Sequence, residues 1–235
     1  MSLLIASITP VMIFLYLINR RDKVQEPKKL LAKCFFGGFL SIALALLIDA
    51  PLAPFADSIS SPFLHAFYNA FIIAAGPEEL AKFLVLYWLV WKSADFDQHY
   101  DGIIYAVFVS LGFALVENIL YVMEGGMGVA VARAVLSVPG HGFFAVLMGY
   151  YFSLAKFHEG TEKNKLLLKS LWMPILFHGL YDFALFYMEA EGLSPWILIA
   201  LMVLFTYVVI RLWRVGFKKI KLHLHKDHID SIETV

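Results

Sequence analysis

The sequence predicts an all-α membrane protein, a polytopic bundle of about seven transmembrane helices. Three observations support this fold class. Hydrophobic residues make up 60% of the 235 residues and the mean hydropathy is +0.74, whereas soluble domains contain roughly 45–50% apolar residues. Apolar runs of the ~20 residues needed to cross a bilayer recur along the chain. Lysine and arginine gather in alternate connections between these runs, which is typical of a multi-pass protein.

The predicted spans follow from the apolar runs in chain order. They lie near residues 3–19, 31–50, 63–91, 101–123, 130–154, 167–188 and 195–213. The third run is longer than a straight span needs at about 1.5 Å per residue, so we expect its outer end, 64–69, to lie in the interface or to tilt. Gly76 and Pro77 are expected to loosen this helix. No internal repeat is visible.

The distribution of charge predicts the orientation of the bundle. Connections 51–62, 124–129 and 189–194 carry acidic but no basic residues, whereas the other connections and the C-terminal segment are basic. The positive-inside rule therefore places the N-terminus outside and the C-terminus in the cytosol. Lys82 and Arg133 are the basic residues expected inside spans. We expect the Arg133 side chain, near the outer end of its span, to extend toward the surface.

The chain is expected to comprise a transmembrane domain, 1–215, and a cytosolic tail, 216–235. The tail is basic and contains several histidines, so we expect it to be solvated and partly disordered. The alternative is a metal site formed by these histidines. The single cysteine, Cys34, excludes an intrachain disulfide.

Ionisable side chains lie at similar depth in four predicted spans, where an unpartnered charge is unfavourable by several kcal/mol. The third span contains Glu78, Glu79 and Lys82. At helical spacing Lys82 follows Glu78 by four residues and Glu79 by three, so it can pair with either carboxylate on one helix face. Such a cluster predicts a functional site. The alternative is a set of structural hydrogen bonds between helices.

The other three spans contribute one glutamate, two histidines and an aspartate. Glu117, in the fourth span, has no basic residue within two turns, so its partner must come from another helix. His141, in the fifth, lies between two glycines, which allow a neighbouring backbone to approach closely. His178 and Asp182, in the sixth, are four residues apart, the spacing at which a carboxylate can hold a ring N–H.

These motifs resemble the PrsW family of intramembrane proteases. The matching motifs, each on a separate span and in the family's order, are Glu78-Glu79-x-x-Lys82, Phe113-x-x-x-Glu117-Asn118, His141 and His178-x-x-x-Asp182. The family is similar to the prenyl-protein (CAAX) endoproteases, which have histidine in place of Glu117, and to one subunit of gamma-secretase. The residues that match the family's essential positions are Glu78, Glu79, Glu117, His141 and His178, supported by Lys82, Phe113, Asn118 and Asp182.

The resemblance implies a glutamate-dependent endopeptidase of the bacterial cell membrane. Its expected partners are the lipid bilayer and a single-span membrane protein, such as an anti-sigma factor, which it would cut near the outer side of the membrane. No nucleic acid partner is expected.

The expected mechanism is hydrolysis by an activated water molecule. A glutamate of the 78/79 pair removes a proton from water, while His178, oriented by Asp182, and Asn118 stabilise the oxyanion. The remaining members of the essential set, Glu117 and His141, position water or protonate the leaving amine.

The sequence leaves two alternatives open. In a metal-dependent version of the same protease, zinc would be bound by Glu79, Glu117, His141 and His178. The sequence has no His-Glu-x-x-His motif, so we expect no cofactor. The other alternative is a proton-coupled transporter or a non-catalytic scaffold, because chains of glutamate and histidine also relay protons. Transporters usually contain internal repeats, which favours the protease.

Overall fold

The computed structural model describes residues 1–233, and within that range the chain forms helices and no strand. The α-helices are α1 (Ser2–Asn19), α2 (Lys28–Asp49), α3 (Pro62–Tyr68), α4 (Gly76–Val90), α5 (His99–Val135), α6 (Ser137–Lys156), α7 (Gly160–Met188) and α8 (Pro195–Glu233). A 3₁₀ turn, η1 (Ala53–Ser58), precedes α3, and a π-helix, η2 (Asn69–Ala75), joins α3 to α4. The predicted all-α fold is confirmed.

Four segments of the described chain are long and apolar enough to cross a membrane. They are Ser2–Asn19, Lys28–Asp49, His99–Lys156 and Pro195–Ile232. The segment His99–Lys156 comprises both α5 and α6. The count of seven spans and the orientation of the bundle stay predictions.

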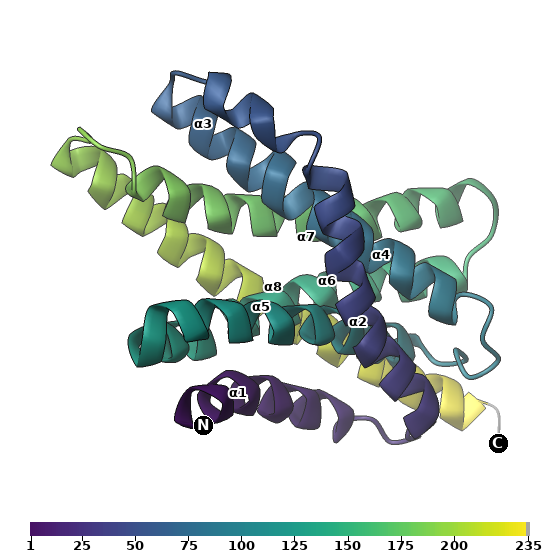
Figure 1. The fold of residues 1–235 in the computed structure, drawn as a ribbon. Helices are drawn as coiled ribbons and strands as arrows, with labels where there is room; N and C mark the ends of the chain where they lie inside the picture. The colour runs from purple at the N-terminus through teal and green to yellow at the C-terminus, as the bar shows by residue number, and fades with distance from the viewer. Residues whose placement is uncertain (234–235) are drawn as a thin grey trace.

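Helix α5 lies at the centre of the bundle, where it packs against α1, α2 and α6 (Figure 1). Its crossing with α2 is very close, because a Cβ atom added to Gly112 would lie 2.0 Å from the carbonyl oxygen of Phe35. Small residues allow helix backbones in a membrane to approach in this way. The crossing positions the next residue, Phe113, whose ring contacts Lys82 of α4.

A π-helical turn interrupts the third predicted span just before its two glutamates. Pro77 has no N–H, and in a regular α-helix its ring crowds the carbonyl four residues back. At the end of η2 the Gly76 N–H bonds instead to the carbonyl of Phe71, five residues back. The expected loosening of the helix at Gly76 and Pro77 is therefore confirmed. Glu78 and Glu79 follow in the first turn of α4, and π-turns are frequent at functional sites.

A sharp turn at Gly126 divides α5 into a long helix and a short segment, 127–135. Gly126 has φ 75° and ψ −161°, a conformation that is essentially restricted to glycine. The turn returns the short segment to the preceding helix, where Arg133 contacts Glu117 and Asn118. The prediction that Arg133 extends toward the surface is wrong, because the turn directs its side chain to a buried carboxylate. Only 11% of that side chain is exposed.

The C-terminal segment continues α8 as one helix, which crosses the bundle from the α7–α8 connection to the C-terminus (Figure 1). His223 is buried, and its Nε2 lies 3.1 Å from the Tyr150 carbonyl oxygen. Asp227 accepts hydrogen bonds from the backbone N–H groups of His99 and Tyr100 at 2.7 and 2.8 Å. The prediction of partial disorder is therefore wrong for the described residues, because they form a helix that docks through His223 and Asp227, whereas most of the other tail side chains are exposed.

Carboxyl groups are buried where the α1–α2 connection meets the start of α5. Glu26 is buried, and its carboxyl group contacts the hydroxyl of Tyr105. Burial, together with the negative charge of Asp101, raises the pKa of Glu26 from 4.5 to about 9. Burial also raises the pKa of Asp22 to about 6. Glu26 is therefore protonated and uncharged at neutral pH.

Candidate functional site

Four helices bring ionisable side chains into one buried network. The predicted site residues that meet there are Glu78, Glu79 and Lys82 from α4, Glu117 from α5, His141 from α6, and His178 and Asp182 from α7. The prediction that these groups share one layer of the bundle agrees with their direct contacts. Each carboxylate has a cationic or imidazole partner, so burial of the charges is compensated.

Lys82 is the centre of this network. Its Nζ atom lies 3.0 Å from Oε2 of Glu78 and 2.8 Å from Oε1 of Glu79, so the predicted pairing with both glutamates is observed. It also lies 3.4 Å from Nδ1 of His141. The three N–H bonds of an ammonium group therefore each have an acceptor. The ring of Phe113 lies 4.1 Å from the same nitrogen, a cation–π contact.

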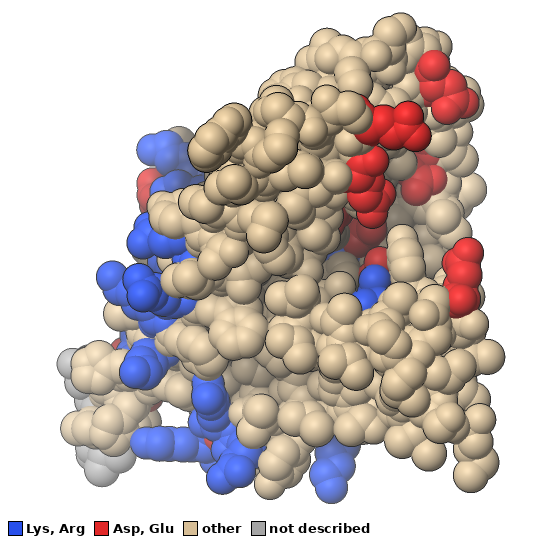
Figure 2. All heavy atoms as spheres, turned by 90° about the vertical axis from the view of Figure 1, so that its left-hand side faces the viewer, with Lys and Arg blue, Asp and Glu red and all other residues tan. Residues whose placement is uncertain are grey.

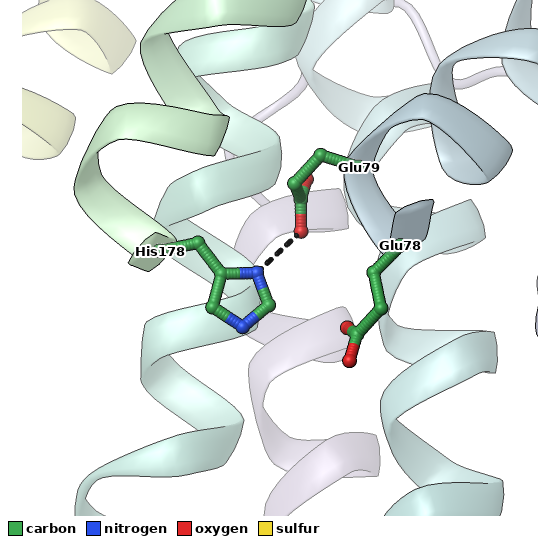
Figure 3. A group of neighbouring side chains, drawn as sticks. All are labelled: Glu78, Glu79 and His178. Atoms are coloured by element: carbon green, nitrogen blue, oxygen red, sulfur yellow. Dashed lines mark hydrogen bonds and ion pairs between the residues drawn. The ribbon is translucent and has the colours of Figure 1, made fainter. Parts of the chain in front are cut away.

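His178 connects the network to α7. Its Nδ1 lies 3.0 Å from Oε1 of Glu79, and Figure 3 shows the two side chains pointing toward each other with Glu78 beside them. Its Nε2 lies 3.2 Å from Oδ2 of Asp182, which is the contact that their spacing predicts. The ring also stacks on Phe144 with a centroid distance of 4.7 Å. Two carboxylates and one aromatic ring thus fix the orientation of the imidazole.

Glu117 and His141 form a second pair in the network. Oε2 of Glu117 lies 2.8 Å from Nε2 of His141 and 3.1 Å from a terminal nitrogen of Arg133. Because Nδ1 of His141 faces the Lys82 ammonium, a neutral ring donates from Nε2 to Glu117. The predicted partner from another helix is therefore His141. Arg133 is a second partner that was not predicted, although the two glycines before Met127 signal a chain reversal.

These side chains border a cavity of about 420 Å³. Glu78 and Glu117 line it, and 17% and 22% of their side chains are exposed. Glu79 is fully buried and, like Lys82, lies behind the cavity wall. Figure 2 shows acidic side chains gathered along a hollow in the surface, away from most of the basic side chains in that view. Of the two adjacent glutamates, Glu78 is the one that can contact water or a substrate in the cavity.

Asn118 does not face this cavity. Its Nδ2 donates to the carbonyl oxygen of Ser7 at 2.7 Å, and its Oδ1 accepts from Nε of Arg133 at 2.9 Å. The side chain is fully buried. The prediction that Asn118 stabilises an oxyanion is therefore wrong, because its amide is used to join α1 and the 127–135 segment to α5.

The donor atoms of Glu78, Glu79 and His178 lie within 4.8 Å of one another, close enough to meet at one divalent cation. Oε2 of Glu79 is buried and has no hydrogen-bond partner among the described residues. The ammonium of Lys82, however, already contacts both glutamates at 2.8–3.0 Å and would repel a metal ion in the same place. The ammonium of Lys82 would therefore compete with a metal ion for these two carboxylates.

Comparison with known proteins assigns the chain to a family. A family profile described as "PrsW family intramembrane metalloprotease" matches residues 26–211. The chain belongs to the PrsW family. The resemblance found from its motifs is confirmed, and as a PrsW-family protein the chain is a membrane peptidase that acts on membrane-embedded proteins. The transporter and scaffold alternatives are therefore set aside.

Relatives in several bacteria cover most of the chain. The protease PrsW of Oceanobacillus iheyensis is 38% identical over 221 residues, which are 94% of this chain and 95% of the relative. The protease PrsW of Geobacillus kaustophilus is 36% identical over 81% of this chain and 83% of its own. The protease PrsW of Bacillus subtilis is 35% identical over 88% of each chain. No solved structure matches.

Proposed function

We propose that the protein is an intramembrane endopeptidase in which Glu78 activates a water molecule. The observation that carries this proposal is the position of the Glu78 carboxylate, which lines the cavity while its neighbour Glu79 is buried behind it. Glu79, Lys82 and His178 act as positioning residues for Glu78. Their mutual contacts of 2.8–3.0 Å hold the base in a fixed position, as general-base catalysis requires.

The chemistry follows from the groups around the cavity. Glu78 takes a proton from water, and the water oxygen forms a bond to the substrate's carbonyl carbon. Arg133 and the His178 ring, which both line the cavity, stabilise the negative charge on the carbonyl oxygen. When the C–N bond breaks, the proton passes to the leaving amine from Glu78 or through the Glu117–His141 pair. Arg133 takes the role that the sequence assigned to Asn118.

The substrate we propose is a single-span membrane protein, such as an anti-sigma factor, cut near the outer side of a bacterial plasma membrane. Seven spans, an external N-terminus and a cytosolic C-terminus agree with the charge pattern. In that orientation the acidic α7–α8 connection, next to the cavity, faces outward. A cut there would separate the external part of the substrate from its span.

Co-expression with tagged single-span proteins tests this proposal. Wild type should produce a shortened fragment, and Glu78→Gln or Glu79→Gln should abolish cleavage while insertion is unchanged. Glu124→Gln is the matched control, because Glu124 is exposed and lies outside the cavity. Cleavage that survives in both Glu78→Gln and Glu79→Gln would refute a glutamate base.

The metal-dependent version of the protease is the second candidate, favoured by the convergence of Glu78, Glu79 and His178 and by the unpaired Oε2 of Glu79. We propose that no metal is required, because Lys82 occupies the position a cation would take. Purified protein should keep its cleavage activity after dialysis against a chelator and contain no stoichiometric metal. Loss of activity on chelation, restored by zinc, would favour the metal-dependent version.

A further inference from the structure

A second cavity, of about 690 Å³, opens beside the one that contains Glu78. It lies between the α3–η2 segment and the end of α7 with the connection that follows. The two cavities share three lining residues, Ala74, Phe186 and Glu189. The two cavities therefore adjoin between the acidic α7–α8 connection and the part of the site that Glu78 lines. We refer to the 690 Å³ cavity as the entry groove.

The size of the entry groove determines what shape of ligand it accepts. An α-helix has a diameter of about 10–12 Å with its side chains. An extended peptide is narrower and advances about 3.3 Å per residue, so several of its residues fit. An extended chain also exposes the peptide carbonyl that a helix hides, which hydrolysis requires.

The charge of the entry groove determines which peptides it favours. Glu189 and Glu191 line it and are exposed, and the lining residues that the structure describes include no lysine or arginine. In the adjoining cavity, the lining cation is Arg133, whose charge is paired with Glu117. A ligand with basic side chains is therefore attracted to the entrance, and an acidic one is repelled.

We propose that the entry groove binds the outer juxtamembrane segment of the substrate in extended form, and that Glu189 and Glu191 select segments carrying lysine or arginine. This inference rests on the proposed protease function, whose cavity the groove adjoins. It names a substrate feature, a basic residue a few positions from the cleaved bond.

A charge-swap experiment tests the selection. A reporter that wild type cleaves is made with either lysine or glutamate at successive positions beside the cut. The lysine form should be cleaved roughly twofold to fivefold faster at positions that reach the entrance, the range expected for exposed ion pairs. Glu189→Lys with Glu191→Lys should reverse that preference. Glu124→Lys, an equal charge change on another acidic connection and outside both cavities, should leave it unchanged. An unaltered preference in the double variant would overturn the selection.

Cross-linking tests the groove without relying on activity. In the Glu79→Gln background and with an added oxidant, Ala190→Cys should form a disulfide with a cysteine in the reporter's outer juxtamembrane segment, because Ala190 lines the entry groove. Gly128→Cys, an exposed position outside the groove, is the control, and the native Cys34 is buried. Cross-linking at Ala190 without wild-type cleavage would support the groove and refute the proposed protease reaction. Wild-type cleavage without cross-linking at Ala190 would refute the groove alone.

Discussion

Replacing Lys82 with methionine removes a charge that two buried carboxylates share. The ammonium contacts Glu78 and Glu79 at 3.0 and 2.8 Å, and methionine retains most of the apolar length of the side chain. The loss therefore comes from leaving buried charge unpaired. Removing one partner of a buried ion pair destabilises a protein by about 3–5 kcal/mol. We expect Lys82→Met to lower the free energy of unfolding by about this amount.

The different exposure of the two carboxylates predicts how this loss divides between them. Glu79 is fully buried, whereas Glu78 faces the cavity and is reached by water. Water can therefore partly solvate Glu78 once the lysine is gone. In double-mutant cycles, Lys82→Met should couple more strongly to Glu79→Gln than to Glu78→Gln. Neutralising Glu79 in the Lys82→Met background should accordingly restore more stability than neutralising Glu78.

Equilibrium unfolding of the purified protein in detergent micelles, followed by the loss of helical circular dichroism, measures these differences. Lys92→Met is the control, because Lys92 is exposed and surface substitutions usually change stability by less than about 0.5 kcal/mol. Equal free energies of unfolding for Lys82→Met and wild type would contradict this prediction. So would a larger coupling energy in the cycle with Glu78.

Two further predictions concern packing and pH. Gly112→Ala should destabilise the protein by about 1–3 kcal/mol and slow cleavage, because its Cβ would overlap the Phe35 carbonyl. Gly128→Ala, in the 127–135 segment and with open space around it, should be neutral or slightly stabilising. Equal melting temperatures for the two variants would refute the close crossing. The pKa of Glu26 is about 9 in the folded protein, against 4.5 for a free glutamate. Its contribution to the free energy of unfolding is therefore fully present below about pH 4.5 and is lost as the pH rises toward 9. Glu26→Gln, which mimics the protonated form, should reduce the fall in melting temperature between pH 6 and 9, and an unchanged pH profile would contradict the assignment.

The parts of the site that the sequence predicts are those set by spacing along one helix. Lys82 reaches both glutamates because residues three and four apart share a helix face, and His178 reaches Asp182 for the same reason. The similar depth of the ionisable residues in the four spans can also be predicted from the sequence, because the rise per residue of a helix is constant. Which helices are neighbours is not visible, so the contact between His178 and Glu79 appears only in the structure.

The predictions that failed depend on single backbone turns or on docking surfaces. Arg133 was expected at the surface, and only the φ of 75° at Gly126 returns it to Glu117. Asn118 is one residue from Glu117, about 100° around the helix, and so faces α1 instead of the cavity. The C-terminal segment is polar enough to be predicted as solvated, yet Asp227 finds two free N–H groups at the start of α5. Hydropathy and charge carry no information on such partners.

The two adjacent glutamates have different environments, which allow Glu78 to act as the base and Glu79 to act as a positioning residue. Neighbouring positions in an α-helix differ by about 100° in direction, so the two side chains leave α4 toward different neighbours. Lys82 follows Glu78 by four residues and Glu79 by three, so its ammonium group lies between the two carboxylates and contacts both. The π-turn and Pro77 before them fix the rotation of α4, which determines that Glu78 faces the cavity and Glu79 faces His178. A one-residue shift in that turn would rotate both carboxylates by about 100° relative to their present partners. We therefore expect that deleting one residue of η2 would abolish cleavage even though every ionisable side chain of the site is retained.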